Sequence, residues 1–194
     1  MLWLLNESSV ADQLNAISPL DGRYSNSVKD LAAYFSESAL MRYRVTVEVE
    51  YLIALGSEKG IKELQSFTKG EQTKLRNIYR NFNAADAQKI KEIELTTNHD
   101  VKAVEYFLRD KMSELGLAAY HSFVHFGLTS QDINNTAIPL SLRDAVSNVY
   151  YVAVNEVLEK LEELQKSWWD VPVLARTHGQ PASPTRMGKE IKVY

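Results

Sequence analysis

Four short segments of the chain set a histidine or an arginine beside small polar residues where helical patterning breaks. They are residues 21–24, 97–100, 125–132 and 177–180. The last is the most constrained, because Pro172 and Pro181 bracket it and Gly179 permits a turn that a β-carbon would resist. His178 is therefore predicted to lie in a rigid, non-helical bend. Imidazole exchanges a proton readily near neutral pH, so this position suits a general acid or base.

The second candidate, His99, stands between Asn98 and Asp100 at a predicted helix start, and Thr129-Ser130 opens another helix. Free backbone amides and the helix dipole favour an anion at such ends. Each segment taken alone is more often a simple turn or helix cap than a functional site. Taken together, they indicate a polar site built from several helix ends.

A metal site is the alternative for His121 and His125, which lie four residues apart and would share one helical face. The glutamate of a zinc protease motif is missing, and no third ligand is evident. We therefore expect no metal at this pair and no other cofactor.

The composition points to a globular protein that acts on a small molecule. Of 194 residues, 45% are hydrophobic, and the formal net charge of -3 argues against a general grip on nucleic acid or an anionic membrane. The chain has no cysteine, which fits a reducing compartment. The apolar opening 1–5 is too short for a signal peptide or a membrane span. A cytoplasmic location is expected.

Helical periodicity dominates the chain, and we find no convincing alternating strand. The expected helices cover 25–35, 37–55, a stretch around 75–82, 83–95, 99–116, a short piece at 121–125, 129–168 and a last one from Pro184. Ser36 should cap the second, Gly56 should end it in a left-handed conformation, and Pro139 should kink or break the long tract. The fold class is therefore all-α. An N-terminal helical domain over 1–117 and the start of a long-helix bundle over 118–194 are expected.

The stretch Thr97 to Tyr106 resembles the adenylosuccinate lyases, a family of the fumarase/aspartase superfamily. The segments 125–135 and 177–181 are similar to the superfamily more broadly, and the likeness runs from about Ile17 to Tyr194. It implies a β-elimination that releases fumarate from adenylosuccinate to give AMP, and from the succinyl-carboxamide ribotide of purine synthesis. It also implies a helical bundle that forms homotetramers.

Carried over by position, the resemblance gives a role to each candidate residue. His178 matches the general acid and His99 the second active-site histidine. The substrate-binding residues implied are Arg23 and Tyr24 for the nucleotide, Thr129 and Ser130 for a succinyl carboxylate, and Asn98, Asp100, Thr177 and Gln180. The fork of donors on Arg23 suits a phosphate.

The family's catalytic base is a serine on a Ser-Ser-x-Met-Pro-x-Lys-x-Asn loop, and these 194 residues contain no such segment. We therefore expect an N-terminal fragment that is inactive alone. One alternative is another lyase of the superfamily, of the argininosuccinate lyase or fumarase type, which the stretch 97–106 disfavours. The other is a non-catalytic helical module for oligomer assembly.

Overall fold

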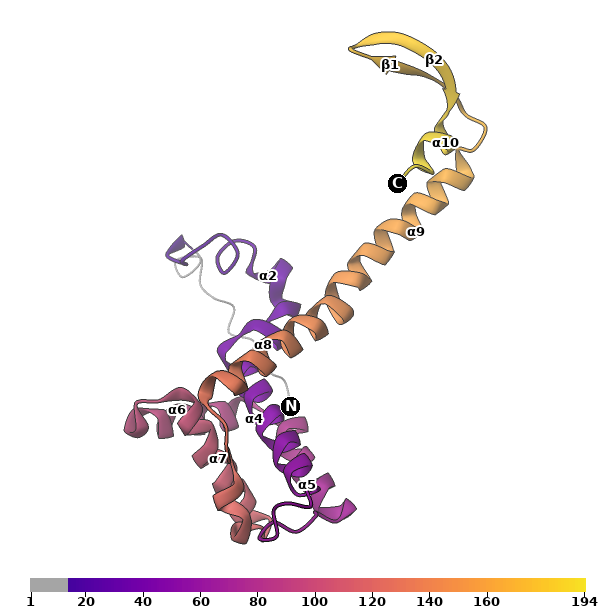
Figure 1. Cartoon of the computed structure of the whole chain (residues 1–194). Helices are drawn as coiled ribbons and strands as arrows, with labels where there is room; N and C mark the ends of the chain where they lie inside the picture. The colour runs from indigo at the N-terminus through magenta and orange to yellow at the C-terminus, as the bar shows by residue number, and fades with distance from the viewer. Residues whose placement is uncertain (1–13) are drawn as a thin grey trace, which may run out of the picture. The chain divides into compact units, whose positions relative to one another are not determined.

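The computed structural model describes residues 14–194, so the apolar opening and most of the first 16 residues lie outside the described part (Figure 1). The chain divides into two compact units, which end and begin at Asp144 and Ala145. Each unit is described by itself. The sequence predicts a domain boundary after Leu117 instead; that boundary refers to a bundle completed by further helices, and it stays a prediction.

The regular elements described in the first unit are all helices. Its elements are α2 (Ser25–Val28), η1 (Lys29–Leu31), α3 (Ala32–Phe35), α4 (Glu37–Leu55), α5 (Lys69–Arg80), α6 (Ala84–Thr97), α7 (Asp100–Glu114), the 3-10 helix η2 (Ala118–Phe123) and α8 (Ser130–Ala145). The predicted helix over 25–35 is thus a series of three short turns. Most other helices of this unit lie close to their predicted ranges, but the helix expected around 75–82 begins at Lys69 and the piece expected at 121–125 is a 3-10 helix that ends at Phe123. The all-α fold class is confirmed.

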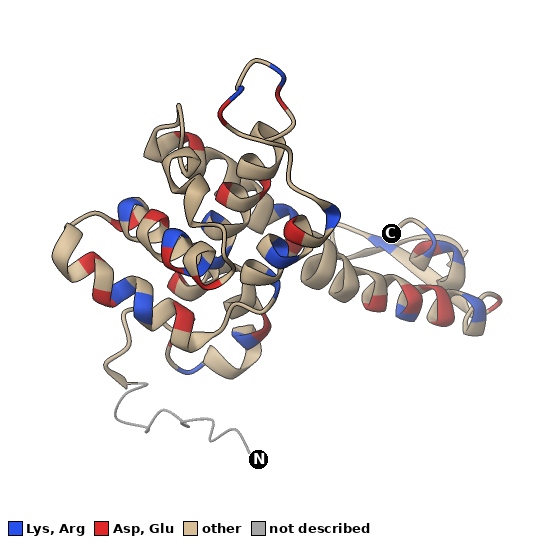
Figure 2. Cartoon of the chain, turned by 90° about the horizontal axis from the view of Figure 1, so that it is seen from below, with Lys and Arg blue, Asp and Glu red and all other residues tan. Residues whose placement is uncertain are grey.

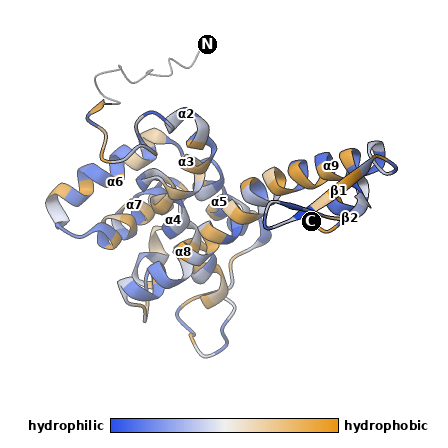
Figure 3. Cartoon of the chain, turned by 90° about the horizontal axis from the view of Figure 1, so that it is seen from above, coloured by the Kyte–Doolittle hydropathy of each residue, from blue (hydrophilic) through white to orange (hydrophobic). Residues whose placement is uncertain are grey.

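The core of this unit lies where α4 and α7 pack together with α5 and α6. Val49 and Leu52 of α4 and Phe107 of α7 are wholly buried, and Leu75 and Ile90 join them from α5 and α6. Each such side chain contributes roughly 1.5–3 kcal/mol relative to its exposed state. Hydrophobic residues accordingly gather on the inner faces of these helices (Figure 3). This core fixes α4 and α7, which carry much of the site described below.

Helix starts in the first unit follow the sequence signals. Ser36 caps α4, its hydroxyl accepting the Ala39 amide at 3.1 Å, and Asn83 with Asp86 forms a capping box at the start of α6. The predicted left-handed end of α4 at Gly56 is wrong, because its φ is -64°. A β-carbon there would lie 3.0 Å from the Phe67 ring, so close packing explains this glycine.

Basic and acidic residues are interspersed along the helices, as Figure 2 shows. Their mixture agrees with the nearly balanced formal charge of the sequence. Among the described residues, no helix is long and apolar enough to cross a membrane.

The second unit continues the long helical tract and ends in a hairpin. Its elements are the π-helical turn η3 (Val146–Tyr150), α9 (Tyr151–Ser167), β1 (Pro172–Thr177), β2 (Gln180–Arg186) and α10 (Met187–Ile191). The predicted break at Pro139 does not occur, since α8 continues through it to Ala145. All of α9 is described, and none of its residues is buried. Apolar side chains such as Val157 and Leu158 are therefore exposed.

The antiparallel hairpin of β1 and β2 is the feature that helical periodicity missed. Thr177 pairs with Gln180, so His178 and Gly179 alone form the turn. Their φ values are 52° and 76°, and two left-handed residues in succession match the right-handed twist of a two-residue hairpin. The helix predicted from Pro184 consequently begins later, at Met187. The predicted non-helical bend at His178 is present as this turn.

Candidate functional site

His99 stands at the junction of α6 and α7, as predicted. Asn98 ends α6 in the left-handed conformation (φ 48°), and His99 is extended and caps α7. Its Nδ1 accepts the backbone N–H of Lys102 at 3.2 Å. In the neutral ring the proton is then on Nε2. The cap thus fixes both the direction and the tautomer of the ring.

Ser130, the first residue of α8, lies next to His99. The distance between the Ser130 Oγ and the His99 Nε2 is 3.4 Å. If Nε2–H donates to this oxygen, the hydroxyl proton of Ser130 is free to bind an anion. Two helix starts that are 31 residues apart in sequence therefore meet at one polar point.

Thr129 makes different contacts from Ser130. Its amide and its hydroxyl both donate to the Asp132 carboxylate, at 2.7 and 2.8 Å. The amide contact is the main cause of a lowered pKa for Asp132. Thr129 therefore secures the start of α8, whereas Ser130 offers its hydroxyl toward His99.

Asp100 ties the start of α7 to α4 and α8. Its Oδ1 accepts the Val101 amide at 2.8 Å, and its Oδ2 lies 2.7 Å from the Arg44 guanidinium. Burial acts to raise the pKa of Asp100, but the amide and Arg44 outweigh it and lower the value. Arg44, itself buried, also donates to Asn134 of α8 at 2.9 Å. One guanidinium thus joins three helices around His99 and Ser130.

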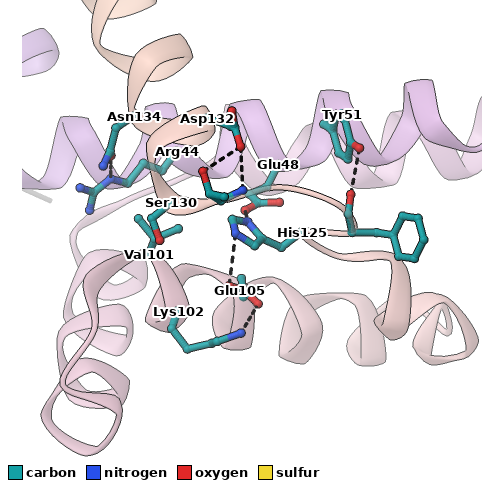
Figure 4. A network of polar contacts seen from close by, with 12 residues as sticks. Arg44, Glu48, Tyr51, Val101, Lys102, Glu105, His125, Ser130, Asp132 and Asn134 are labelled. Atoms are coloured by element: carbon teal, nitrogen blue, oxygen red, sulfur yellow. Dashed lines mark hydrogen bonds and ion pairs between the residues drawn. The ribbon is translucent and has the colours of Figure 1, made fainter.

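A buried cluster around His125 lies beside these residues and was not predicted from the sequence (Figure 4). The His125 Nδ1 is 2.5 Å from the Glu48 Oε1 on α4, and its Nε2 is 3.8 Å from the Glu105 Oε1 on α7. The Lys102 ammonium lies 2.8 Å from the Glu105 Oε2 and forms an ion pair with it. Burial raises the pKa of Glu48, although the hydrogen bond from His125 opposes this. A hint of this cluster is present in the sequence: Glu48 falls on the same helical face as the apolar residues Val45, Val49 and Leu52.

The spacing of His121 and His125 does not form a shared face. The 3-10 helix η2 ends at Phe123, so His125 lies beyond it in a left-handed turn with φ of 62°. His121 faces Ser113 at 3.2 Å, whereas His125 faces Glu48. Each ring therefore has a separate partner.

Arg23 and Tyr24 precede α2, and the Arg23 guanidinium lies 4.7 Å from the centre of the Tyr24 ring. Within the described part of the first unit, no hydrogen bond or ion pair joins either side chain to His99 or Ser130. The contact between Arg23 and Tyr24 is a cation–π pair. Their part in nucleotide binding stays a prediction.

Comparison with known proteins places this arrangement in a family. The profile of the lyase family matches residues 22–194. The chain belongs to the lyase family. It is similar to the adenylosuccinate lyase of Dictyostelium discoideum, with 52% identity over 187 residues, which cover 94% of this chain and 40% of that protein.

Bacterial relatives give the same match. The adenylosuccinate lyases of Vibrio cholerae and Escherichia coli are 46% and 44% identical over 179 residues, covering 92% of this chain and 39% of each relative. The chain thus spans about 40% of the length of the curated relatives it matches. The resemblance inferred from the stretch 97–106 is confirmed.

In this chain, the predicted site residues fall into three groups. Asn98, His99, Asp100, Thr129 and Ser130 gather at the starts of α7 and α8. Arg23 and Tyr24 stand apart before α2. Thr177, His178 and Gln180 belong to the hairpin of the second unit.

Proposed function

We propose that this chain is the N-terminal part of an adenylosuccinate lyase, which eliminates fumarate from adenylosuccinate to give AMP and acts likewise on the succinyl-carboxamide ribotide. One observation carries the proposal: His99 meets Ser130 where two helices begin. This point offers the Ser130 hydroxyl and the starts of two helices to an anion. The names of the relatives support this substrate over others, and its carboxylates suit a site for an anion.

In the proposed reaction a carbon–nitrogen bond breaks. A base takes a proton from the carbon beside that bond, and the electrons of the C–H bond form the double bond of fumarate. The electrons of the C–N bond leave on nitrogen, which receives a proton from His178 as general acid. The resemblance implies that the base is a serine on a loop that these 194 residues do not contain.

The remaining residues bind the two ends of the substrate. Ser130 receives a succinyl carboxylate, and Thr129 contributes to this binding by securing the start of α8; Asn98, His99 and Asp100 position the reacting part. Arg23 receives the phosphate and Tyr24 lies against the nucleotide. We assign Thr177 and Gln180 to substrate binding beside His178.

We further propose that the complete protein is a cytoplasmic homo-oligomer, with a tetramer expected. The support is the exposed apolar surface of the second unit, including Tyr150, Val157 and Trp168. Large apolar surfaces of this kind favour contacts between subunits.

The test is product analysis with the protein encoded by the complete reading frame. Adenylosuccinate, argininosuccinate and malate are supplied separately, and fumarate with AMP is expected from adenylosuccinate alone. Fumarate from argininosuccinate or malate instead would favour the other lyases of the superfamily.

The 194-residue chain serves as the second sample, and we expect it to release no fumarate. Titration with AMP then distinguishes a binding unit from a helical assembly module. Saturable binding supports the first, and oligomer formation without binding supports the second.

A further inference from the structure

We propose that Glu48 is a positioning residue of the lyase: through His125 it holds the turn over 125–129 and so sets Ser130 against His99. The inference rests on the proposed function for its meaning in catalysis. Its structural part, the link from Glu48 to the contact of Ser130 with His99, can be tested without turnover.

The turn needs an anchor because its backbone is unfavourable. His125 has a φ of 62°, in the left-handed region that residues with a β-carbon seldom adopt, and Gly127 follows with a φ of 73°. A strained residue of this kind costs about 1–3 kcal/mol and persists where its surroundings hold it. The contacts of the His125 ring are therefore expected to stabilise this backbone conformation.

Glu48 provides the anchor from the core. It is 1% exposed and lies on α4 between the wholly buried Val45 and Val49. Its Oε1 is 2.5 Å from the His125 Nδ1, and the Tyr51 hydroxyl, one turn further along α4, donates to the Phe126 carbonyl at 2.9 Å. A single rigid helix thus holds two successive residues of the turn.

Glu105 clamps the ring from the other side and leads directly to His99. Its carboxylate lies 3.8 Å from the His125 Nε2 and 2.8 Å from the Lys102 ammonium, with Arg109 at 3.8 Å. The backbone N–H of the same Lys102 donates to the His99 Nδ1. The buried cluster is therefore joined to His99 through α7 and to Ser130 through the turn.

The cluster is poorly explained as a device for stability. The Oε2 of Glu48 is buried without a hydrogen-bond partner in the described structure. A buried ion pair is often no better than apolar residues of the same volume, and an unpaired buried oxygen costs about 1–3 kcal/mol. A carboxylate in this position is understandable if its task is to direct the His125 ring.

The first experiment records the ring ¹H–¹⁵N NMR signals of His125 and His99 in the 194-residue chain. Glu48→Leu should remove the hydrogen-bonded Nδ1–H signal of His125 and also shift the ring signals of His99. Glu48→Gln should keep both, because its amide oxygen can still accept from Nδ1. A folded Glu48→Leu chain with unchanged His99 signals would overturn the inference.

Glu50→Leu is the matched control. Glu50 lies on the same helix, and its carboxylate is held by Arg76 at 2.8 and 2.9 Å and by Tyr79 at 2.7 Å. Its removal should leave the signals of both histidines unchanged. If Glu48→Leu does not fold, Glu48→Asp replaces it: this variant keeps the charge but withdraws the carboxylate by one methylene. Unmoved His99 signals in Glu48→Asp would count equally against the inference.

The second experiment measures steady-state kinetics and product inhibition in the complete enzyme. Glu48→Leu should lower kcat/KM by on the order of a hundredfold, as a misplacement of about 1 Å can do. The affinity for fumarate should fall while the affinity for AMP stays unchanged, and Glu48→Gln should restore most of the loss. A wild-type enzyme without lyase activity would refute the proposed function alone. An active enzyme in which Glu48→Leu binds fumarate normally would refute this inference alone.

Discussion

His125 and His178 share a left-handed backbone conformation but differ in their surroundings. Both have a positive φ, 62° and 52°, and each is followed within two residues by a left-handed glycine. His125 is clamped between Glu48 and Glu105 inside the first unit. His178 is exposed at the tip of the hairpin in the second unit. The same local geometry therefore serves a buried anchor in one case and a presented imidazole in the other.

The difference follows from how each unit is packed. The first unit has a core of wholly buried side chains, so a polar group within it must find a partner. In the second unit, α9 has no buried residue. An imidazole on that unit is free to meet a substrate. We expect His178 to matter for chemistry and His125 for structure, and the five predictions below probe this division.

The largest effect is expected for His178→Gln in the complete enzyme. Proton donation by a placed side chain contributes about 10²–10⁴-fold in rate, so kcat should fall on this scale. The free energy of unfolding should change by less than about 0.5 kcal/mol, because the side chain is exposed. Steady-state kinetics and urea unfolding measure the two quantities. Near-normal turnover would remove the general-acid assignment.

Arg23→Ala is the reference for a residue that acts in binding. A phosphate contact made equally in the ground and transition states affects KM and leaves kcat largely unchanged. Loss of a hydrogen bond to a charged group should raise KM by about ten- to a hundredfold. An equal loss of kcat in Arg23→Ala and His178→Gln would mean that the two residues do not have separate roles.

The converse is expected for His125→Leu. Removing one partner of a buried pair leaves the Glu48 charge uncompensated, which costs about 3–5 kcal/mol near neutral pH. Urea unfolding of the 194-residue chain measures the loss, with His178→Leu as the control that should leave stability nearly unchanged. Equal stability of the two variants would contradict the division.

A smaller effect is expected at the glycines that follow the two histidines. Gly127 and Gly179 have φ values of 73° and 76°, and a β-carbon at Gly179 would meet no atom within 4 Å. Alanine should therefore cost about 1–2 kcal/mol at either site through backbone strain alone. Thermal unfolding measures this. A stabilised Gly179→Ala chain would show that the turn is not held in the left-handed region.

The last prediction concerns pH and two glutamates on α4. Burial raises the pKa of Glu48 above 4.5, so its contribution to stability is largest below 4.5 and declines as the pH rises through the folded value. The hydrogen bond from Arg76 lowers the pKa of Glu50, so its contribution is present above 4.5 and is lost as the pH falls through the lower value.

Unfolding free energies between about pH 3 and 7 test this for Glu48→Gln and Glu50→Gln. The difference from wild type should slope in opposite directions for the two variants. Parallel slopes would mean that the Glu48 carboxyl is not buried in solution as it is here.

Local signals in the sequence determined much of the fold. Capping residues and apolar spacing act within one or two helical turns, so the starts of α4, α6 and α7 could be read directly. The position of His99 at a helix start and the bend at His178 follow from the same kind of signal. The hairpin was missed because Pro184 was interpreted as a helix start, whereas the left-handed pair His178-Gly179 is itself a hairpin signal.

The tertiary structure alone decided which polar groups meet. Glu48 and His125 are 77 residues apart, and Ser130 and His99 are 31 apart. Such contacts depend on how α4, α7 and α8 pack. The apolar pattern of one helix does not indicate which other helix packs against it. The sequence therefore predicted which residues could do chemistry, and only helix packing brought Glu48 against His125.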